Sequence, residues 1–453
     1  MSNRWPFIIC AALSLLLAMG CSVQNAHVKS LAESPEHLRA EERQMQPWRE
    51  SRFGLFIHWG PVSLEGTEIG WSRGKEVPID RYDNLYEKFN PVNFSAEEWV
   101  GIAKAAGAKY FVVTSKHHDG FCIFDSRYTD YDIMSTPFKR DVLKELVEEC
   151  KKQKIKFSLY YSIIDWYHSD YLPRGAADKR PVEGADFERY VTYMKSQLKE
   201  LVDNYGPLEV LWFDGYWESY WTHEHGKMLY KYVKALQPGI IINNRVDRGR
   251  VDGKGTTKKD KDYAGDFDTP EQEVGTFQMD PPWETCMTLC KQWAWKPNDD
   301  MKSLEECIDV LVRTVGGDGN LLLNVGPMPD GRIEPRQVER LKEIGEWLEK
   351  YGQSIYATRG GPFKPGDWGA STRKDKLIYL HVLNWQPDGL KLPPIPAKIL
   401  SRSVLTGGAA AVKQTQEGID ISVPREHQQD IDTIVVLELD GPADELAPVA
   451  VRN

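Results

Sequence analysis

The chain has 453 residues, which exceeds one ordinary domain and predicts a large domain followed by a smaller one. Its 57 Lys and Arg against 67 Asp and Glu give a formal net charge of −10, which would repel nucleic-acid phosphates and argues against a nucleic-acid partner. One short basic run, residues 254–261, contains Gly255 and Asp260. We interpret it as a solvated loop.

The N-terminus has the shape of an export signal. Arg4 precedes an apolar run from Phe7 to Met19 that is too short to span a membrane as a helix. Gly20 and Cys21 follow, which resembles the processing site of bacterial lipoproteins. We expect residues 1–20 to be a signal peptide and Cys21 to carry a lipid. The protein would then be exported to the periplasm or to the outer-membrane or cell surface, touching the membrane only through this anchor. Secretion without a lipid is the alternative.

The next segment is polar, and the one after it is strongly patterned. Residues 21–47 are rich in charge and are expected to form a linker. From residue 48 to about residue 355, apolar β-rich runs alternate with amphipathic helical patterns, which is typical of repeated βα units. The pattern predicts the α/β class and a (β/α)8-like barrel. Its expected strands are residues 53–57, 110–114, 156–160, 208–213, 240–242 and 320–325. Six strands are two short of eight, so we expect an irregular barrel.

Helices are expected between these strands, with recognisable ends. One covers residues 95–106 and opens with the capping-box pattern of Ser95 and Glu98. Others are expected at residues 186–205 and 334–351, and Gly352 suits a left-handed cap at the end of the last one.

Beyond residue 355 the pattern changes to strands alone. Strands are expected at residues 377–383, 398–405, 418–423 and 433–439. Short strands without intervening helices predict that residues 356–453 form an antiparallel β-sandwich.

The cysteine pattern argues against a disulfide framework. Removal of Cys10 and lipidation of Cys21 would leave an odd number in the mature fold, namely Cys122, Cys150, Cys286, Cys290 and Cys307. Cys286 and Cys290 lie four residues apart and could pair or bind a metal. Because no second Cys or His pair stands at ligand spacing, we favour buried free thiols.

Polar side chains follow five of the expected barrel strands. The strands end in His58, in Lys116-His117-His118-Asp119, in Tyr160-Tyr161-Ser162, in Trp212-Phe213-Asp214 and in Asn243-Asn244-Arg245. The carboxyl ends of parallel barrel strands meet at one face, where the active sites of such barrels lie. These side chains are therefore expected to converge on one pocket.

Each of these residues also has a structural interpretation. A single His after a strand is commonly a hydrogen-bonded structural residue, and Asp214 could cap the following turn. A buried cluster of His, Tyr, Trp, Arg and carboxylate is costly unless it binds something polar, and this favours a binding site. A metal held by His58, His117 and His118 is an alternative. Adjacent His residues point in different directions, and the neighbouring Trp and Tyr suit a sugar ring better, so no metal is expected.

Five strings in this part of the chain resemble one known family. They are FGLFIHWG at 53–60, SKHHDGF at 115–121, LWFDG at 211–215, INNR at 242–245 and GGDGNLLLNVGP at 316–327. In this order they resemble glycoside hydrolase family 29, the α-L-fucosidases, over residues 45 to 355. The resemblance implies an irregular (β/α)8-like barrel followed by a β-sandwich, which agrees with the pattern above.

The resemblance also implies an activity and a set of site residues. It implies a retaining exo-α-L-fucosidase that releases terminal L-fucose from fucosylated glycans, without a cofactor, through a covalent glycosyl-enzyme intermediate. Asp214 would be the nucleophile. Trp71 would shape the pocket around the fucose methyl group. The fucose hydroxyls and ring would be held by His58, His117, His118, Tyr160, Trp212 and Arg245.

The acid/base residue is harder to place by resemblance. The string GDFDTPEQE at 265–273 resembles the segment that carries it, and Glu271 is the best match. Glu273 and Glu284 remain rivals. In a retaining mechanism Asp214 must be ionised to attack, whereas Glu271 must hold a proton for the departing oxygen.

Two other functions remain open. An α-L-galactosidase would keep the scaffold and accept one more hydroxyl at C6, which pockets reject only modestly. A catalytically inactive carbohydrate-binding protein is disfavoured because both candidate carboxylates are present.

Overall fold

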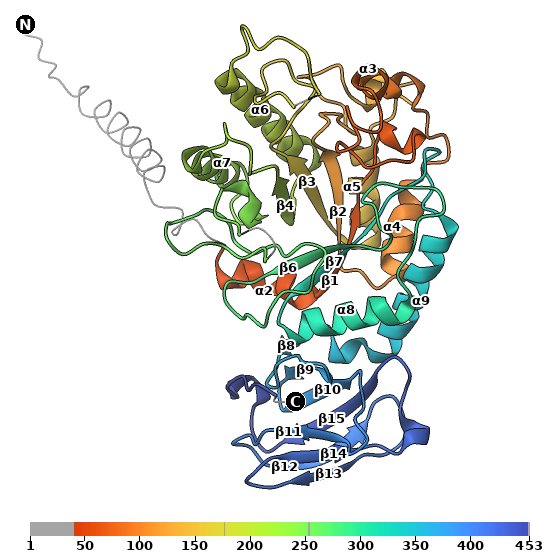
Figure 1. Cartoon of the computed structure of the whole chain (residues 1–453), viewed down its shortest axis with the longest axis vertical. Helices are drawn as coiled ribbons and strands as arrows, with labels where there is room; N and C mark the ends of the chain where they lie inside the picture. The colour runs from red at the N-terminus through yellow and green to blue at the C-terminus, as the bar shows by residue number, and fades with distance from the viewer. Residues whose placement is uncertain (1–39, 176, 252–253, 452–453) are drawn as a thin grey trace, which may run out of the picture.

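The computed structural model describes residues 40–175, 177–251 and 254–451. Figure 1 shows a parallel barrel with surrounding helices in the upper part of the molecule and a group of antiparallel strands, in blue, below it. The expected signal peptide, residues 1–20, and the expected lipid-bearing Cys21 lie outside the described residues. Within the described residues, no helix is long and apolar enough to cross a membrane.

Seven parallel strands form the main sheet, in the order β5-β4-β3-β2-β1-β7-β6. All six expected strands are present, and an additional one, β6, lies at an edge. The bounds are β1 Phe53–Ile57, β2 Tyr110–Lys116, β3 Lys156–Ser162, β4 Val210–Asp214, β5 Ile241–Ile242, β6 Glu284–Thr288 and β7 Asn320–Val325. The sheet pairs its strands in parallel register throughout, for example Leu55 with Phe111 on one side and with Leu323 on the other.

An irregular eighth segment, residues 266–272, joins the two edges of this sheet. On the β5 side, Asp266 N–H donates to Ile242 C=O at 2.7 Å, and Asn243 and Phe267 form a parallel bridge. On the β6 side, Cys286 N–H donates to Pro270 C=O at 3.1 Å. The barrel is therefore closed by backbone hydrogen bonds, and this segment carries Glu271.

Helices cover most of the barrel, and their starts follow the sequence signals. Ser95 caps α4 by accepting the Glu98 N–H at 3.2 Å, and Asp186 caps α6. The expected left-handed cap at Gly352 is wrong: its φ is −59°, and the chain continues into a 3-10 turn. Between β5 and β6 the described residues form no α-helix, only the 3-10 turn Asn244–Val246. The helices are α3 Ile79–Asp83, α4 Ala96–Ala105, α5 Val142–Gln153, α6 Phe187–Tyr205, α7 His223–Leu236, α8 Leu304–Gly316 and α9 Pro335–Tyr351.

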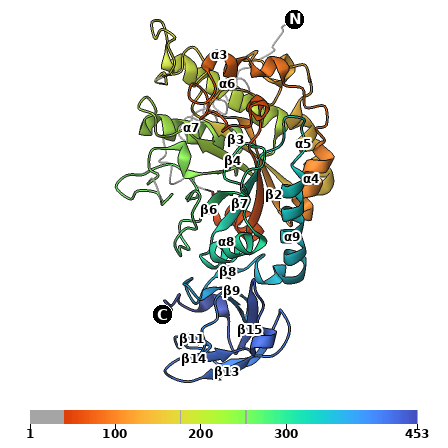
Figure 2. The ribbon, with the colours of Figure 1, turned by 45° about the vertical axis from the view of Figure 1, so that its right-hand side comes forward.

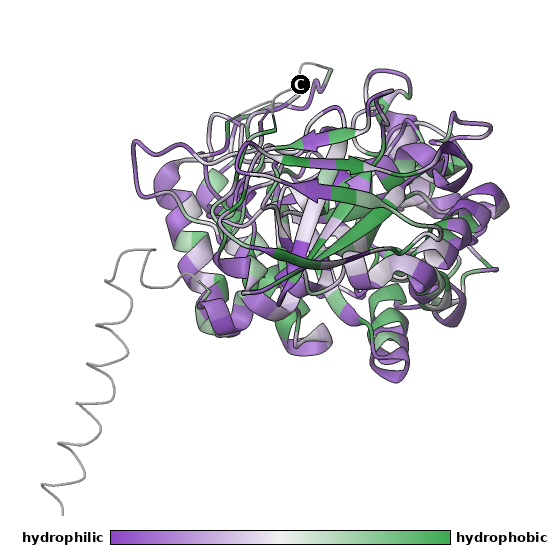
Figure 3. Ribbon diagram, turned by 90° about the horizontal axis from the view of Figure 1, so that it is seen from below, coloured by the Kyte–Doolittle hydropathy of each residue, from purple (hydrophilic) through white to green (hydrophobic). Residues whose placement is uncertain are grey.

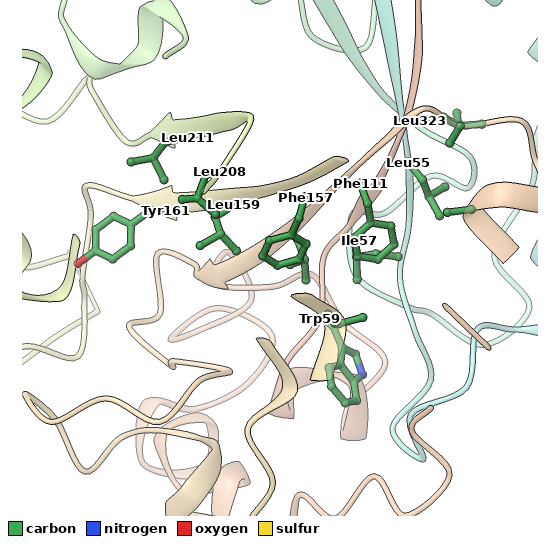
Figure 4. Close-up of a cluster of buried hydrophobic side chains, with 14 of the residues drawn as sticks. Leu55, Ile57, Trp59, Phe111, Phe157, Leu159, Tyr161, Leu208, Leu211 and Leu323 are labelled. Carbon is green, nitrogen blue, oxygen red and sulfur yellow. The ribbon is translucent and has the colours of Figure 1, made fainter. Parts of the chain in front are cut away.

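Alternate residues of the strands face opposite ways and build two apolar layers. The outer layer packs under the helices and includes Leu55, Phe111 and Leu159, as Figure 4 shows. The barrel interior holds one cluster to which every strand and segment 266–272 contribute, and its members include Phe56, Tyr110, Tyr160, Trp212, Ile241, Phe267, Cys286 and Leu322. Seen from below, the strands carry much of the hydrophobic colour and the outer helices much of the hydrophilic colour (Figure 3).

The last residues of the expected linker form a helix instead. Residues Glu42–Ser51 form helix α2, which is the first described helix. Met45 and Trp48 of α2 belong to the interior cluster of the barrel, and the Trp48 ring lies 4.7 Å from that of Phe267. The end of the charge-rich segment is therefore part of the barrel, because two apolar side chains three residues apart cover its interior.

Two antiparallel sheets follow the barrel, as the pattern predicts. One has the order β12-β15-β10-β9-β8 and the other β11-β14-β13, and an apolar cluster lies between them. Figure 2 shows them below α8 and α9, and α8 contacts β9. The bounds are β8 Arg359–Gly360, β9 Gly369–Lys374, β10 Leu377–Val382, β11 Leu390–Leu392, β12 Ile399–Val404, β13 Ala411–Gln414, β14 Ile419–Ser422 and β15 Thr433–Leu439.

Candidate active site

A pocket of about 210 Å³ opens at the carboxyl ends of the barrel strands. This volume is below the roughly 300–1,000 Å³ that drug-sized ligands occupy, and it suits a single small ring. All nine residues proposed from the sequence line it: His58, Trp71, His117, His118, Tyr160, Trp212, Asp214, Arg245 and Glu271. These side chains, most of which follow different barrel strands, therefore converge on one pocket as expected.

Arg245 joins the two carboxylates that the sequence nominates. One terminal guanidinium nitrogen donates to Asp214 Oδ1 at 3.0 Å, and the other donates to Glu271 Oε2 at 2.7 Å. The guanidinium is held from behind by Thr269 Oγ1 at 3.0 Å and lies over the Trp212 ring, 4.6 Å from its centroid. A buried cation at this position offsets the cost of placing two negative charges in one pocket.

Asp214 ends β4 and is buried. Tyr160 O–H donates to its Oδ2 at 3.1 Å, and His118 Nε2 lies 3.7 Å from the same oxygen. Burial acts to raise the pKa of Asp214, but the charge of Arg245 and the proximity of His118 bring it below its ordinary value. Because burial lowers the pKa of His118 to about 4, Arg245 provides the positive charge at neutral pH. Asp214 is therefore ionised there.

The three histidines of the pocket are neutral at pH 7. Burial lowers the pKa of His58 to about 3 and brings that of His117 well below its ordinary value. His58 Nδ1 is bonded to Asn324 at 2.7 Å, and His118 Nδ1 to Ser162 at the same distance. A neutral imidazole can donate from one nitrogen and accept at the other, which suits hydroxyl groups.

The imidazoles do not form a metal-ligand group. Over residues 40–451, leaving aside the undescribed positions, no cluster of three or more His, Cys, Asp or Glu side chains could hold a metal ion. Cys286 and Cys290, whose spacing in the sequence left open a disulfide or a metal site, are buried free thiols. Cys122, Cys150 and Cys307 are also buried free thiols.

The two rivals of Glu271 lie elsewhere. Glu273 is exposed and does not line the pocket. Glu284 begins β6 and is 1% exposed. It accepts hydrogen bonds from Tyr110 O–H and from Trp212 Nε1, the latter at 3.1 Å. Its partners belong to the barrel interior, so Glu284 lies in the core and Glu271, whose side chain is 34% exposed, faces the pocket.

The pocket also contains residues that sequence reasoning missed. These are Phe56, Tyr216, Trp217, Arg250, Cys286 and Trp293. Trp217 follows Asp214 closely, and its ring stacks near that of Trp71 with centroids 6.0 Å apart. The Trp293 ring lies 4.8 Å from that of His58. Trp293 follows β6, so recognition of that strand would have placed it at the same strand-end face.

This arrangement of groups defines a class of enzyme. An ionised carboxylate and a second carboxylate face one ring-sized pocket whose walls are aromatic and whose polar groups suit hydroxyls. These are the requirements of a glycoside hydrolase that works with two carboxyl groups.

Comparison with known proteins identifies the family. The family described as "Alpha-L-fucosidase" matches residues 20–353, so the chain belongs to the α-L-fucosidase family of glycoside hydrolases. The human plasma α-L-fucosidase is 34% identical over 412 residues, which are 83% of each chain.

Solved structures of bacterial relatives agree. α-L-Fucosidase isoenzyme 1 from Paenibacillus thiaminolyticus has a TM-score of 0.78 and 34% identity, covering 88% of this chain and 99% of its own. A family 29 α-L-fucosidase from Bacteroides thetaiotaomicron, solved as a trapped covalent intermediate with 2-fluoro-fucosyl fluoride, has a TM-score of 0.79 and 30% identity, covering 90% and 98%. The chain is thus a family member in sequence and in fold, including the C-terminal sheets.

Proposed function

We propose that this enzyme releases terminal L-fucose from fucosylated glycans with retention, using Asp214 as the nucleophile and Glu271 as the acid/base. The observation that carries the proposal is the pair of hydrogen bonds from Arg245 to two carboxylates that line one pocket of the size of a single sugar ring. The covalent intermediate of the Bacteroides relative supports the retaining route. Pocket size supports removal of a terminal unit.

In the first step Asp214 attacks. A carboxylate oxygen of Asp214 forms a bond to the anomeric carbon while the bond from that carbon to the leaving oxygen breaks, and Glu271 transfers its proton to this oxygen. Arg245 keeps Asp214 ionised before the attack. Tyr160 orients it through the hydrogen bond to Oδ2.

In the second step Glu271 acts as a base. It takes a proton from water, the water oxygen bonds to the anomeric carbon, and the ester to Asp214 breaks, which regenerates both carboxyl groups. Because esterification removes the negative charge of Asp214, Arg245 then has only Glu271 as a charged partner in the pair and stabilises its ionised form. In the first step, by contrast, Glu271 carries a proton, and its second oxygen can still accept the hydrogen bond from Arg245. The Arg245–Glu271 contact is therefore expected to change between a neutral and a charged hydrogen bond during turnover.

The remaining pocket residues hold the sugar. The neutral imidazoles of His58, His117 and His118 can bond its hydroxyls as donors and acceptors. Nδ1 of His117 is buried and has no hydrogen-bond partner within the described part of the chain, which a bound polar group could satisfy. Trp212 and Trp71 offer apolar surface, and Trp71 would lie against the fucose methyl group.

A chromogenic aryl α-L-fucoside tests the activity. We expect the enzyme to hydrolyse it. NMR of the first-formed product should show α-L-fucose, because attack by Asp214 and then by water gives overall retention at the anomeric carbon. The matching aryl α-L-galactoside should be cleaved more slowly, because its extra hydroxyl would meet an apolar wall. Binding of L-fucose without any turnover would instead support an inactive sugar-binding protein.

We also propose that Cys21 carries a lipid that anchors the exported enzyme. The support is the apolar run before Gly20 and the Cys that follows it. In membrane fractions of a bacterial host, the full chain should sediment with membranes, and a Cys21→Ser variant should not. Equal sedimentation of both would contradict the anchor.

A further inference from the structure

Two aromatic walls of the pocket come from connections rather than from strands. Trp71 lies in the connection between β1 and α4, and Trp293 lies in the one between β6 and α8. Both line the pocket, and the Trp293 ring lies 4.8 Å from that of His58. Neither residue is in a helix or a strand, so contacts between the connections have to fix the positions of the two rings.

The side chain of Glu68 joins the two connections. Its Oε2 accepts the Trp293 N–H at 2.9 Å, and its Oε1 accepts the Ala294 N–H and the Ile69 N–H, both at 3.1 Å. An ionised carboxylate has two oxygens that only accept, so it can receive all three donors, whereas the amide of a Gln would turn one position into a donor. The residue type therefore matches the three N–H groups that it faces.

An apolar cluster packs at the same junction. Apart from Ala294, its buried members all come from the connection that carries Glu68, and Trp293 packs against it. Ala294 is buried, and its N–H would be costly to leave without an acceptor. Glu68 thus supplies the polar part of a contact whose apolar part this cluster provides. The buried members are Val62, Ile69, Val77, Tyr82, Leu85 and Ala294.

The backbone of Glu68 also fixes the turn that carries Trp71. Ser72 N–H donates to Glu68 C=O at 3.1 Å and closes this turn. Gly70, inside the turn, has a φ of +67°, and a Cβ there would lie 3.0 Å from His117 Nδ1. Glu68 therefore lies between the two aromatic walls: its side chain binds the connection after β6, and its backbone closes the turn that passes beside the pocket histidines.

The carbonyl of Trp293 has an anchor of its own. It accepts a hydrogen bond from the Asn324 side-chain amide at 2.8 Å, and Asn324 Oδ1 is bonded to His58 Nδ1 at 2.7 Å. Trp293 is therefore held at its N–H by Glu68 and at its C=O by the same Asn324 that orients His58. Loss of the Glu68 carboxylate would remove one of these two anchors and free the ring to move away from His58.

The reacting groups do not depend on these anchors. The hydrogen bonds to Asp214 and Glu271 come from residues outside the two connections. We propose that Glu68 is a positioning residue that holds the Trp293 ring against His58 and thereby raises the affinity of the pocket for the fucose ring. It takes no part in the attack or in proton transfer. This inference rests on the proposed function and names a residue that determines how tightly the sugar is bound.

Kinetics with an aryl α-L-fucoside separate binding from chemistry. Glu68→Ala should raise KM, and the Kd for L-fucose measured by calorimetry, about five- to twentyfold while kcat stays within about twofold, because an interaction made equally in the bound substrate and in the transition state is lost. Glu68→Gln keeps the shape and one acceptor oxygen and should raise both constants about two- to fivefold. The matched control is Glu65→Ala in the same connection. Its carboxylate pairs with the exposed Arg81, so this variant should change neither constant.

A double-mutant cycle shows whether Glu68 acts through Trp293. Trp293→Ala should itself raise KM and Kd, and adding Glu68→Ala should raise them by less than about twofold further, because the ring that Glu68 holds has been removed. If Glu68 only stabilised the fold, the two effects would multiply. Melting temperatures are measured for every variant, and Glu68→Gln takes the place of Glu68→Ala in the cycle if the latter does not fold.

The outcomes separate this inference from the proposed function. Effects that multiply in the double variant, an unchanged KM and Kd in Glu68→Ala, or a fall in kcat larger than the rise in KM would overturn the inference and leave the fucosidase proposal intact. Binding of L-fucose without turnover of any fucoside would contradict the proposed function alone, because the cycle can still be measured on the Kd for L-fucose.

Discussion

Two buried carboxylates of the barrel, Asp214 and Glu284, lie close to the same tryptophan, but their surroundings shift their pKa values in opposite directions. Asp214, at the end of β4, faces the cation Arg245, and its pKa lies below the ordinary value despite burial. Glu284, at the start of β6, faces the neutral donors Tyr110 and Trp212, and burial raises its pKa to about 7. Trp212 touches both environments, since its Nε1 bonds Glu284 and its ring lies under Arg245.

The comparison shows what decides the chemistry of a buried acid. Neutral hydrogen bonds reduce the cost of burial but leave the proton favoured, whereas a buried guanidinium reverses the balance. Position in the sequence does not distinguish the two carboxylates, because both lie in a barrel strand. Substitutions at each carboxylate and at Arg245 can therefore test which surroundings set the chemistry of each acid.

The largest expected effect is from Asp214→Ala. Loss of the nucleophile should lower kcat for an aryl α-L-fucoside by about 10⁴-fold or more, as removal of catalytic nucleophiles does elsewhere. The melting temperature should stay the same or rise, because a charged group that the fold does not need has been removed. Azide should restore part of the activity and give a β-configured product. Near-wild-type turnover of Asp214→Ala would refute its role.

Replacement of Glu271 should have an effect that depends on the leaving group. A sugar leaving group needs the proton and a nitrophenolate does not, so Glu271→Ala should slow oligosaccharide cleavage by about 10²–10⁴-fold and aryl fucoside cleavage much less in the first step. Glu273→Ala, two residues away and exposed, is the matched control and should change neither rate. A leaving-group-dependent loss in Glu284→Ala but not in Glu271→Ala would move the acid/base role to Glu284.

Removal of the Arg245 cation should leave Asp214 in surroundings like those of Glu284, where burial raises the pKa of a carboxyl group. In Arg245→Gln, burial of Asp214 is no longer offset and its pKa should rise. Asp214 must be ionised, so the acid limb of kcat/KM should move to a pH about one to three units higher, and the rate at neutral pH should fall about 10²-fold. Arg250→Gln, which loses bonds to Thr269 and Tyr216, should leave the acid limb in place. An unmoved limb in Arg245→Gln would contradict this explanation.

The smallest expected effect concerns stability at Glu284. Its folded pKa of about 7 lies above the ordinary value of 4.5, so the folded state binds the proton more tightly and loses stability as the pH rises from about 4.5 to 7. Glu284→Gln removes this loss, which is up to roughly 3 kcal/mol. Urea unfolding at pH 5 and pH 8 should show the variant gaining on wild type at the higher pH. A difference that does not change with pH would refute the raised pKa, and Glu273→Gln serves as the control.

The fold was largely predictable wherever apolar runs mark the strands. The six expected barrel strands are all present, and the residues that follow them form the pocket. Segment 266–272 could not be found in this way, because it joins the barrel through a few backbone hydrogen bonds and carries Asp266, Asp268 and Glu271 among its residues. Strand β6 was missed because its sequence, ETCMT, begins with a carboxylate that only the interior partners make tolerable.

The site was predictable to a similar extent. Residues at strand ends could be nominated from position alone, and His58, Asp214 and Arg245 are examples. Trp293 could not, since its strand was unrecognised. The contact of Arg245 with both carboxylates was also hidden, because it depends on how segment 266–272 returns towards β5. Among the C-terminal strands, the short β8, β11 and β13 lack enough residues to show an alternating pattern.

The central claim, that Asp214 forms a covalent bond to fucose, has a direct test. The enzyme is incubated with 2-fluoro-fucosyl fluoride, digested, and analysed by peptide mass mapping. The account predicts one fluorofucosyl group per chain on the peptide that contains Asp214, with the modified residue assigned by fragmentation, and no adduct in Asp214→Ala. An adduct on another carboxylate, or steady turnover of aryl α-L-fucoside by an enzyme that never forms an adduct, would contradict it.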